Sequence, residues 1–310
     1  MATVEHSPSA QASATHVNFA RTDQPDRQKL VGRIGPWQLV RLLNEGELAR
    51  VYVARPEAAP EEQVSTYVIK VLRKEWWRDP QAIEMQRRAA WIGNKVSHPH
   101  LLPVLSANVQ QPPFYLVSPL LAGSLLSATI EQKNMLSLPA VLWVARQVSE
   151  ALAALHEATG MIHADVKPSN IFLSPEGHAT LVDMGFAHAP SEMRHWSCRP
   201  VIGTLHYIAP EVVTSSLAAE PRSDLYSLGV TLYEMLTGAL PFKTADPEKL
   251  VRQHREDVPT CIRHHRPQLP KPVAELVHRL LAKDPLRRPE SAAEVAATLM
   301  RLEIDCFAIR

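Results

Sequence analysis

Two short polar segments contain residue types that can handle protons, anions and hard cations. The first, His163–Asn170, places Asp165, Lys167 and Asn170 within six residues, and Asp183 begins an Asp-Met-Gly segment thirteen residues after Asn170. A carboxylate can accept a proton or bind a cation such as Mg²⁺, and a lysine ammonium can neutralise an anion. Each segment alone also fits a plain loop, either a polar helix-to-strand connection or a common turn. Further motifs in a fixed order are needed to decide whether the two segments form a chemical site or are ordinary loops.

Such motifs follow in the second half of the chain. Gly203–Glu211 reads GTLHYIAPE, Ser223–Val230 reads SDLYSLGV, and Lys283–Pro289 reads KDPLRRP. Together with the two polar segments, they resemble the motifs of eukaryotic-type (Hanks-type) serine/threonine protein kinases of the bacterial kind. The resemblance covers about residues 37–302. It implies a bilobal α+β fold, with a small β-rich lobe that carries one main helix and a larger helical lobe.

The resemblance also implies roles for the polar residues. The aspartate at Asp165 orients the substrate hydroxyl and accepts its proton, while Lys167 neutralises the transferred phosphoryl group and favours serine or threonine as substrate. Asn170 and Asp183 correspond to the Mg²⁺ ligands of the family. Lys70, on an expected strand, corresponds to the lysine that anchors ATP. The implied cofactors are therefore ATP and Mg²⁺, and the implied partners are protein substrates.

The loop that would cover the nucleotide departs from the family pattern. The pattern G-x-G-x-x-G-x-V begins at Asn44 and ends at Val51, and Gly46 is the one glycine that remains. Glycine serves there because the backbone must approach phosphates closely and adopt positive φ. Asn44 tolerates such conformations better than most residues, so a hairpin still forms. Glu45 and Glu47 are expected to place negative charge near the anionic nucleotide.

Lys70 lacks the helical partner of its family counterpart. That partner is a glutamate nine residues before a His-Pro pair, and the same count here gives Ala89. Gln86 lies one turn earlier on the same face, whereas Glu84 is about 140° away on a helix of 3.6 residues per turn. We expect Asp183 to hold Lys70, with Gln86 as a further candidate. A local shift of the helix that brings in Glu84 is the alternative.

The connection between the lobes is expected to bind adenine. Ser118 gates the back of the pocket, and Pro119, Leu120 and Leu121 follow it. Adenine uses the carbonyl of the first residue after the gate and both backbone groups of the third. Pro119 therefore loses no group that the ligand needs, and Leu121 supplies the N–H. The resemblance adds three apolar residues around the base, Val51, Val68 and Phe172.

The elements that position these residues form a β-rich front and a helical back. Composition and alternation predict strands over 37–43, 50–54, 66–72, 114–117, 171–173 and 180–182. Asp79-Pro80 should open a helix to about Lys95, and apolar spacing predicts helices over 138–156, 223–237, 272–281 and 291–302. The expected organisation is a disordered polar tail over 1–35, a small lobe over 36–121, a large lobe over 122–302 and a tail over 303–310.

The composition excludes several other classes of protein. The 310 residues are 45% hydrophobic and 21% charged, and the net charge of +1 favours neither nucleic acid nor an anionic membrane. The three cysteines lack CxxC spacing, which argues against a disulfide framework or a cysteine zinc site and suits the cytoplasm. We expect neither a secretory signal nor a membrane anchor. The sequence leaves the oligomeric state open.

Two functions of different classes remain open. The groups that touch magnesium and the nucleophile are present, which favours a protein serine/threonine kinase, although a weakly active one. The alternative is a pseudokinase, a nucleotide-binding or scaffold module that keeps the fold. Ala164 replaces the arginine that receives an activation-loop phosphate in many family members. We therefore expect activity without phosphorylation of Ser191 or Ser197.

Overall fold

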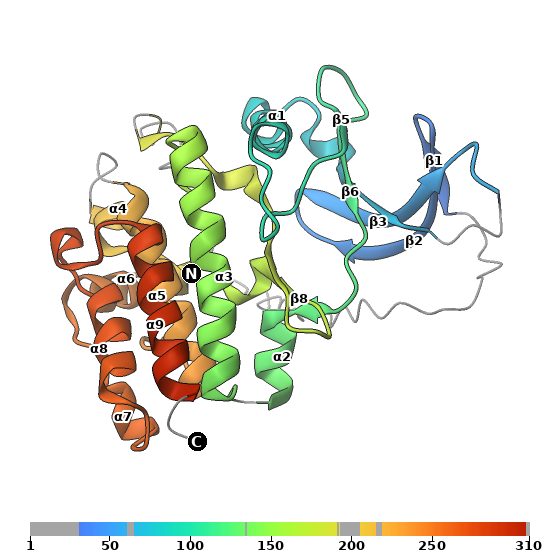
Figure 1. Cartoon of the computed structure of the whole chain (residues 1–310). Helices are drawn as coiled ribbons and strands as arrows, with labels where there is room; N and C mark the ends of the chain where they lie inside the picture. The colour runs from blue at the N-terminus through green and yellow to red at the C-terminus, as the bar shows by residue number, and fades with distance from the viewer. Residues whose placement is uncertain are drawn as a thin grey trace, which may run out of the picture.

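The computed structural model of the chain describes residues 31–60, 65–133, 135–190, 192, 205–214 and 219–307. Within these residues the chain forms two lobes (Figure 1). Strands and one long helix make up the smaller lobe, and helices dominate the larger one. This is the bilobal α+β fold that the sequence predicts.

The small lobe is built on a six-stranded antiparallel sheet with the order β1-β2-β3-β4-β6-β5. Its strands are β1 (Gly32–Ile34), β2 (Trp37–Glu45), β3 (Ala49–Pro56), β4 (Tyr67–Leu72), β5 (Ser106–Asn108) and β6 (Tyr115–Pro119). Valine, isoleucine and tyrosine recur in these segments, and such residues suit a half-buried pleated surface. Strand β4 is paired on both sides, so the position of Lys70 is fixed by the sheet.

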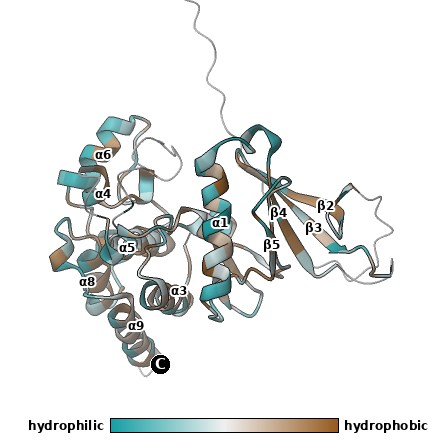
Figure 2. Ribbon diagram, turned by 90° about the horizontal axis from the view of Figure 1, so that it is seen from above, coloured by the Kyte–Doolittle hydropathy of each residue, from teal (hydrophilic) through white to brown (hydrophobic). Residues whose placement is uncertain are grey.

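Helix α1 (Pro80–Lys95) stands between this sheet and the larger lobe, as the view from above shows (Figure 2). It begins where the sequence predicts, because the Asp79 side chain accepts the Ala82 N–H at 2.8 Å and Pro80 takes the first position. A single turn, η1 (Lys74–Trp76), precedes it. Gly93 allows close packing, since a Cβ there would lie 2.5 Å from a Val104 methyl group.

The large lobe contains most of the helices and a second small sheet. Its helices are α2 (Leu126–Lys133), α3 (Leu138–Thr159), α4 (Pro210–Thr214), α5 (Pro221–Thr237), α6 (Pro247–Glu256), α7 (Ile262–His265), α8 (Lys271–Leu280) and α9 (Ala292–Phe307). The sheet consists of β7 (Ser124–Leu125), β8 (Ile171–Leu173) and β9 (Ala179–Leu181). Single turns are η2 (Pro168–Asn170), η3 (Met184–Phe186), η5 (Leu205–Tyr207) and η6 (Pro285–Arg287).

Helix α3 is the central helix of this lobe. Ten of its residues are buried, and it ends at Gly160, whose φ of 67° provides the left-handed C-cap. Among the described residues, it is the one helix long and apolar enough to cross a membrane by length and composition. More than half of its apolar window, 56%, is buried inside the lobe, which is typical of a core helix.

Two borders predicted from the sequence are wrong. Strand β1 lies within the expected tail, because Gly32 pairs with Leu39 and Ile34 is buried. Helix α9 continues to Phe307, past its expected end at residue 302. The added turn is held by Glu303, whose carboxylate accepts from the Arg146 guanidinium of α3 at 3.0 Å. The rest of the expected tails, 1–30 and 308–310, lies outside the described residues.

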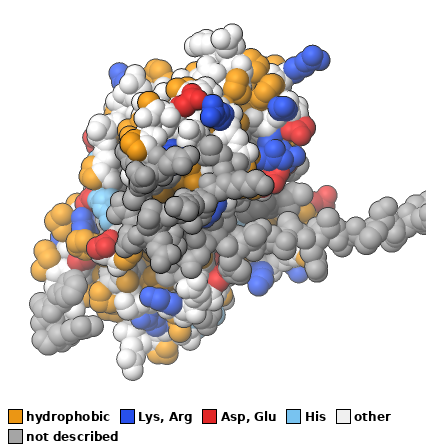
Figure 3. Space-filling view, turned by 90° about the vertical axis from the view of Figure 1, so that its right-hand side faces the viewer, with side chains coloured by type: hydrophobic (Ala, Val, Ile, Leu, Met, Phe, Trp, Pro, Cys, Tyr) orange, Lys and Arg blue, Asp and Glu red, His pale blue; other side chains and the backbone are white. Residues whose placement is uncertain are grey.

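Charges of both signs are interspersed on the small-lobe side of the molecule. Figure 3 shows this face, where described Lys and Arg side chains stand among Asp, Glu and apolar side chains. Exposed ion pairs of the small lobe include Arg33 with Glu57 at 2.6 Å and Arg50 with Glu45 at 2.7 Å. This mixture agrees with the net charge of +1.

Candidate active site

A cavity of about 910 Å³ lies between the two lobes. Its size is within the roughly 300–1,000 Å³ of sites for small organic molecules. It contains ten of the site residues expected from the sequence: Asn44, Gly46, Val51, Val68, Lys70, Pro119, Leu121, Asn170, Phe172 and Asp183. Those from the small lobe lie on strands β2, β3, β4 and β6 or just after β2 and β6, and the chain from η2 to η3 supplies those from the large lobe.

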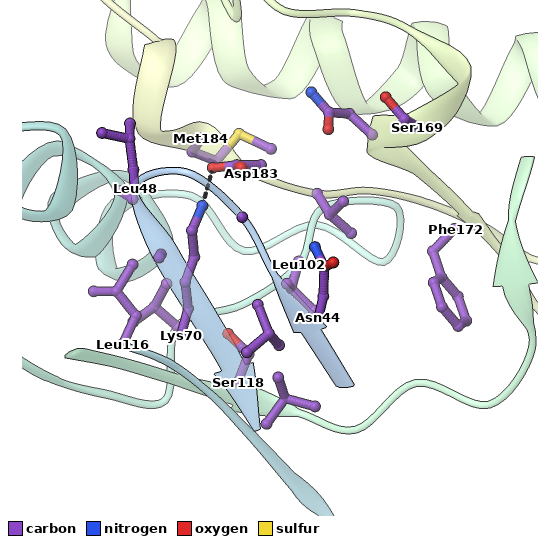
Figure 4. A pocket seen from close by; sticks show the side chains of 18 of the residues that line it. Asn44, Leu48, Lys70, Leu102, Leu116, Ser118, Ser169, Phe172, Asp183 and Met184 are labelled. Carbon is purple, nitrogen blue, oxygen red and sulfur yellow. Dashed lines mark hydrogen bonds and ion pairs between the residues drawn. The ribbon is translucent and has the colours of Figure 1, made fainter. Parts of the chain in front are cut away.

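Lys70 and Asp183 form an ion pair inside this cavity (Figure 4). The Lys70 Nζ atom donates to Asp183 Oδ1 at 2.6 Å, across 113 residues of sequence. Burial opposes ionisation of Asp183, but the charge and hydrogen bond of Lys70 outweigh it and lower the pKa of this carboxyl below its ordinary value. Asp183 adopts a φ of 66°, and aspartate is among the few residues that tolerate this region. The carboxylate is therefore ionised and fixed at neutral pH.

Asp165, Lys167 and Asn170 contact one another beside the cavity. Lys167 Nζ lies 2.8 Å from Asp165 Oδ1, and the Asn170 side-chain N–H donates to Asp165 Oδ2 at 2.6 Å. Asp165 is 4% exposed. Because the amide N–H of Asn170 is directed at Asp165, its carbonyl oxygen remains available for a cation. The structure therefore brings the three residues of the first polar segment into contact with one another.

Asp224 on helix α5 binds the backbone at the start of the His163–Asn170 segment. Its carboxylate accepts the N–H groups of His163 at 2.7 Å and Ala164 at 2.8 Å. Burial opposes ionisation of Asp224, but hydrogen bonds from His156 and His163 prevail and lower its pKa. Ala164 has a φ of 64°, an uncommon conformation for alanine that these bonds maintain.

The hinge, which is the connection between the lobes after Ser118, contacts the cavity through Pro119, Leu120 and Leu121. Strand β6 ends at Pro119, and the backbone N–H of Leu120 donates to Thr66 at 2.8 Å. The middle residue of the hinge is therefore bound to the segment before β4, while Pro119 and Leu121 line the cavity. Ser118, the expected gate, is buried at the back.

Comparison with known proteins places the chain in a family. A profile described as "Protein kinase domain" matches residues 37–299. The chain belongs to the protein kinase family. It is 28% identical over 265 residues to serine/threonine-protein kinase PrkC of Bacillus subtilis, which covers 86% of this chain and 40% of the relative. It is 32% identical over 265 residues to PknH of Mycobacterium tuberculosis H37Rv, which covers 84% and 41%. The chain thus spans about two fifths of the length of these relatives.

The covering loop, residues 46–48 between β2 and β3, and its flanking residues depart from the expectation in two ways. Asn44 and Gly46 both lack positive φ, so the hairpin forms without left-handed backbone at these positions. The charge of Glu45 is also not directed at the nucleotide, because Arg50 binds it across the hairpin at 2.7 and 2.8 Å. The conformational tolerance of asparagine is therefore not what forms this loop.

Within the described part of the chain, no carboxylate of α1 is paired with Lys70, as the count along the helix predicts. Ala89 is buried and lines the cavity, and Glu84 faces outward to Arg88 at 3.4 Å. Gln86 is 5% exposed, and its Oε1 atom has no hydrogen-bond partner among the described residues. A second cavity of about 30 Å³ adjoins Lys70, Gln86 and Ala89, which is enough for one or two waters. Of the two candidates, Asp183 binds Lys70 directly.

Arg88 is a residue of this site that the sequence analysis missed. Its guanidinium is buried, donates to the Ala187 carbonyl at 2.9 Å and lies 2.9 Å from the Glu192 carboxylate. These contacts tie α1 to the chain just after Asp183. The adjacent Arg87 is exposed and donates only to Val109 in the described structure. The pair of arginines carries no sequence signal that distinguishes the buried one.

Glu211, the last residue of the Gly203–Glu211 motif, forms an ion pair with Arg288 of the Lys283–Pro289 motif. Arg288 is buried and binds Glu211 through two nitrogens, each at 2.7 Å, and Ser223 also donates to Glu211 at 2.7 Å.

Ala164 packs in an apolar cluster with Ile162, where the family arginine would present its charge. Ser191 and Ser197, the expected phosphorylation sites, lie outside the described residues.

Proposed function

We propose that the chain is a protein serine/threonine kinase that transfers the γ-phosphate of Mg-ATP to a protein hydroxyl group. The observation that carries this proposal is the Lys70–Asp183 ion pair inside a cavity of nucleotide size. The family membership and the names of the relatives support it. Lys167 beside Asp165 supports a protein serine or threonine as acceptor.

Each step assigned to the chain follows from the geometry of its own residues. Asp165 is buried and held by Lys167 and Asn170, so it can orient an incoming hydroxyl and accept its proton. Lys167 would then neutralise the transferred phosphoryl group, and Lys70 would anchor the α- and β-phosphates. Most of the catalysis is positioning and electrostatic stabilisation, which a preorganised set of charges provides.

The oxygen atoms of Asn170 and Asp183 fit a magnesium site. Magnesium binds oxygen ligands, and in kinases it keeps several waters and takes the nucleotide phosphates as further ligands. A dense protein cage is therefore not needed, and among the described residues no cluster of three or more His, Cys, Asp or Glu side chains is placed to hold a metal. The bound ion would neutralise charge between the phosphates. Asn170 and Asp183 would hold it while Lys70 orients Asp183.

The alternative is a pseudokinase that binds nucleotide and acts as a scaffold. It is favoured by one observation, the alanine where α1 should present a carboxylate to Lys70. Without that carboxylate, Lys70 is anchored from the large lobe by Asp183 alone among the described residues. Kinases generally need the strand lysine and helix glutamate paired, so its loss lowers the expected rate.

The test is phosphate transfer by the wild-type chain and by Asp165→Asn. We expect wild type to phosphorylate itself or a generic protein, with the site mapped by mass spectrometry. Asp165→Asn should reduce transfer by at least a hundredfold and leave the Mg-ATP thermal shift unchanged, because Asp165 acts on the hydroxyl and not on the nucleotide. A thermal shift without transfer in wild type would favour the scaffold. Equal transfer by both proteins would show a contaminating kinase.

We further propose that the lobes meet at the connection from Pro119 to Gly123, which separates a small lobe up to residue 121 from a large lobe that continues to the end of α9 at Phe307. The partners proposed are protein substrates, and their identity is set by surfaces beyond the catalytic residues. A cytoplasmic location is proposed because ATP is available there and the cysteines suit a reducing compartment. Detection of the endogenous protein in cell fractions would test the location.

A further inference from the structure

A tryptophan outside the kinase motifs holds the covering loop in place. The indole Nε1 of Trp76 donates to the carbonyl of Glu47 at 3.0 Å. Arg73 binds the same loop twice, through its backbone N–H to Leu48 O at 2.9 Å and through its guanidinium to Gly46 O at 3.3 Å. Three consecutive carbonyl groups of the loop are therefore bound to the connection between β4 and α1.

These bonds orient the amide groups of the loop. In a trans peptide the N–H points opposite to the carbonyl of the same unit. Since three carbonyls are directed to Trp76 and Arg73, the N–H groups of Glu47, Leu48 and Ala49 are directed away from them. Successive backbone N–H groups on one side of a turn form a binding surface for anions such as phosphate.

The loop lies against the residues that would bind the nucleotide phosphates. Leu48 lines both cavities together with Lys70 and Asp183, and Figure 4 shows it beside that ion pair. Trp76 itself lines the large cavity, half-buried in a cluster with Leu72. The contacts of the loop thus belong to the nucleotide site and not only to the packing of the small lobe.

We propose that Trp76 is a positioning residue for Mg-ATP, which keeps the covering loop closed over the phosphates. This inference rests on the proposed function. Two of the three family glycines are replaced here, so the loop cannot depend on their freedom to fold onto the ligand. A side-chain bond instead orders the loop before the ligand arrives, which lowers the entropy cost of binding. The loop acts on the phosphates, and Trp76 acts through the loop.

The adjacent tryptophan provides a matched control. Trp77 also donates one indole hydrogen bond of 3.0 Å, but to Leu72 O in strand β4, and it belongs to the same apolar cluster. Trp76→Phe and Trp77→Phe therefore each remove one such bond and retain an aromatic ring. Binding of Mg-ATP and of adenosine to each protein is measured by calorimetry, together with the KM for ATP and kcat.

Trp76→Phe should weaken Mg-ATP two- to tenfold, the range expected for one net hydrogen bond, and leave adenosine unchanged because it has no phosphates. The KM for ATP should rise by the same factor. Trp77→Phe should alter neither ligand. Arg73→Ala, which removes the longer bond to Gly46, should weaken Mg-ATP in the same direction and by less.

Two results would overturn the inference. In the first, Trp76→Phe binds Mg-ATP as tightly as wild type. In the second, it loses affinity for ATP and adenosine equally, which would mean that Trp76 only packs the small lobe. Wild type that binds no Mg-ATP would instead overturn the proposed function, and this outcome is seen without any variant. Urea unfolding of each variant shows whether its fold is retained, and Arg73→Ala tests the loop even if Trp76→Phe is unstable.

Discussion

Restoring the missing carboxylate on α1 should increase activity. Ala89 is 6% exposed, lines the nucleotide cavity and adjoins the small cavity beside Lys70. A glutamate at this position can extend into these spaces and accept from the Lys70 ammonium, whose direct partner in the described structure is Asp183. Alanine and glutamate both suit a helix, so the change costs little helical propensity.

The size of the effect follows from the placement of Lys70. Misplacement of a catalytic group by about 1 Å can cost on the order of 10²-fold in rate, or roughly 2.7 kcal/mol. Asp183 already supplies part of the restraint on Lys70, so a second carboxylate should recover about half of this barrier. Ala89→Glu should therefore raise kcat/KM for ATP by about tenfold, which is roughly 1.4 kcal/mol.

The assay measures initial rates of γ-phosphate transfer over a range of ATP concentrations. Ala89→Gln is the matched control, because it has the same size and shape without the charge and should gain less than threefold. Glu84→Ala should leave the rate unchanged, since Glu84 is 47% exposed and faces Arg88. If Ala89→Glu gains no more than Ala89→Gln, the reasoning from charge is wrong. If Glu84→Ala abolishes phosphate transfer, then Glu84 and not Ala89 is the residue of α1 that faces Lys70.

Two further predictions concern Arg88 and a buried histidine. Arg88→Ala should lower kcat about tenfold and the free energy of unfolding by about 2 kcal/mol, because it removes charged bonds to Ala187 and Glu192. The exposed Arg87→Ala should change neither quantity, and a full kcat in Arg88→Ala would contradict the role assigned to that contact. Burial, reinforced by Lys283, lowers the pKa of His254 from 6.5 to about 3. The unfolded chain therefore binds more protons between these values, and stability falls as the pH decreases below 6.5. Between pH 7.5 and pH 5, His254 should lower the free energy of unfolding, measured with urea, by about 2 kcal/mol. The variant His254→Asn should lose that part of the pH dependence. If the variant keeps the pH dependence of wild type, the assignment to His254 is wrong.

The order and spacing of the motifs could be read from the sequence alone. Asp165, Lys167 and Asn170 are close in the chain, so one loop brings them together whatever the rest of the fold does. The start of α1 at Asp79-Pro80 is likewise local, because a cap and a first-turn proline act within a few residues. The absence of a carboxylate at Ala89 also follows from a count along one helix.

Contacts between distant segments were decided by the tertiary structure. Lys70 reaches Asp183 because β4 is an interior strand of its sheet and the residue before η3 lines the same cavity between the lobes. Arg88 is buried and Arg87 exposed because α1 packs against the chain after Asp183, and adjacent helical residues point about 100° apart. The spacing of the motifs therefore predicts which residues belong to the candidate active site. The packing of the helices and strands decides which other side chains bind these site residues. A hydrogen bond needs its two atoms about 3 Å apart, and the sequence does not give that distance.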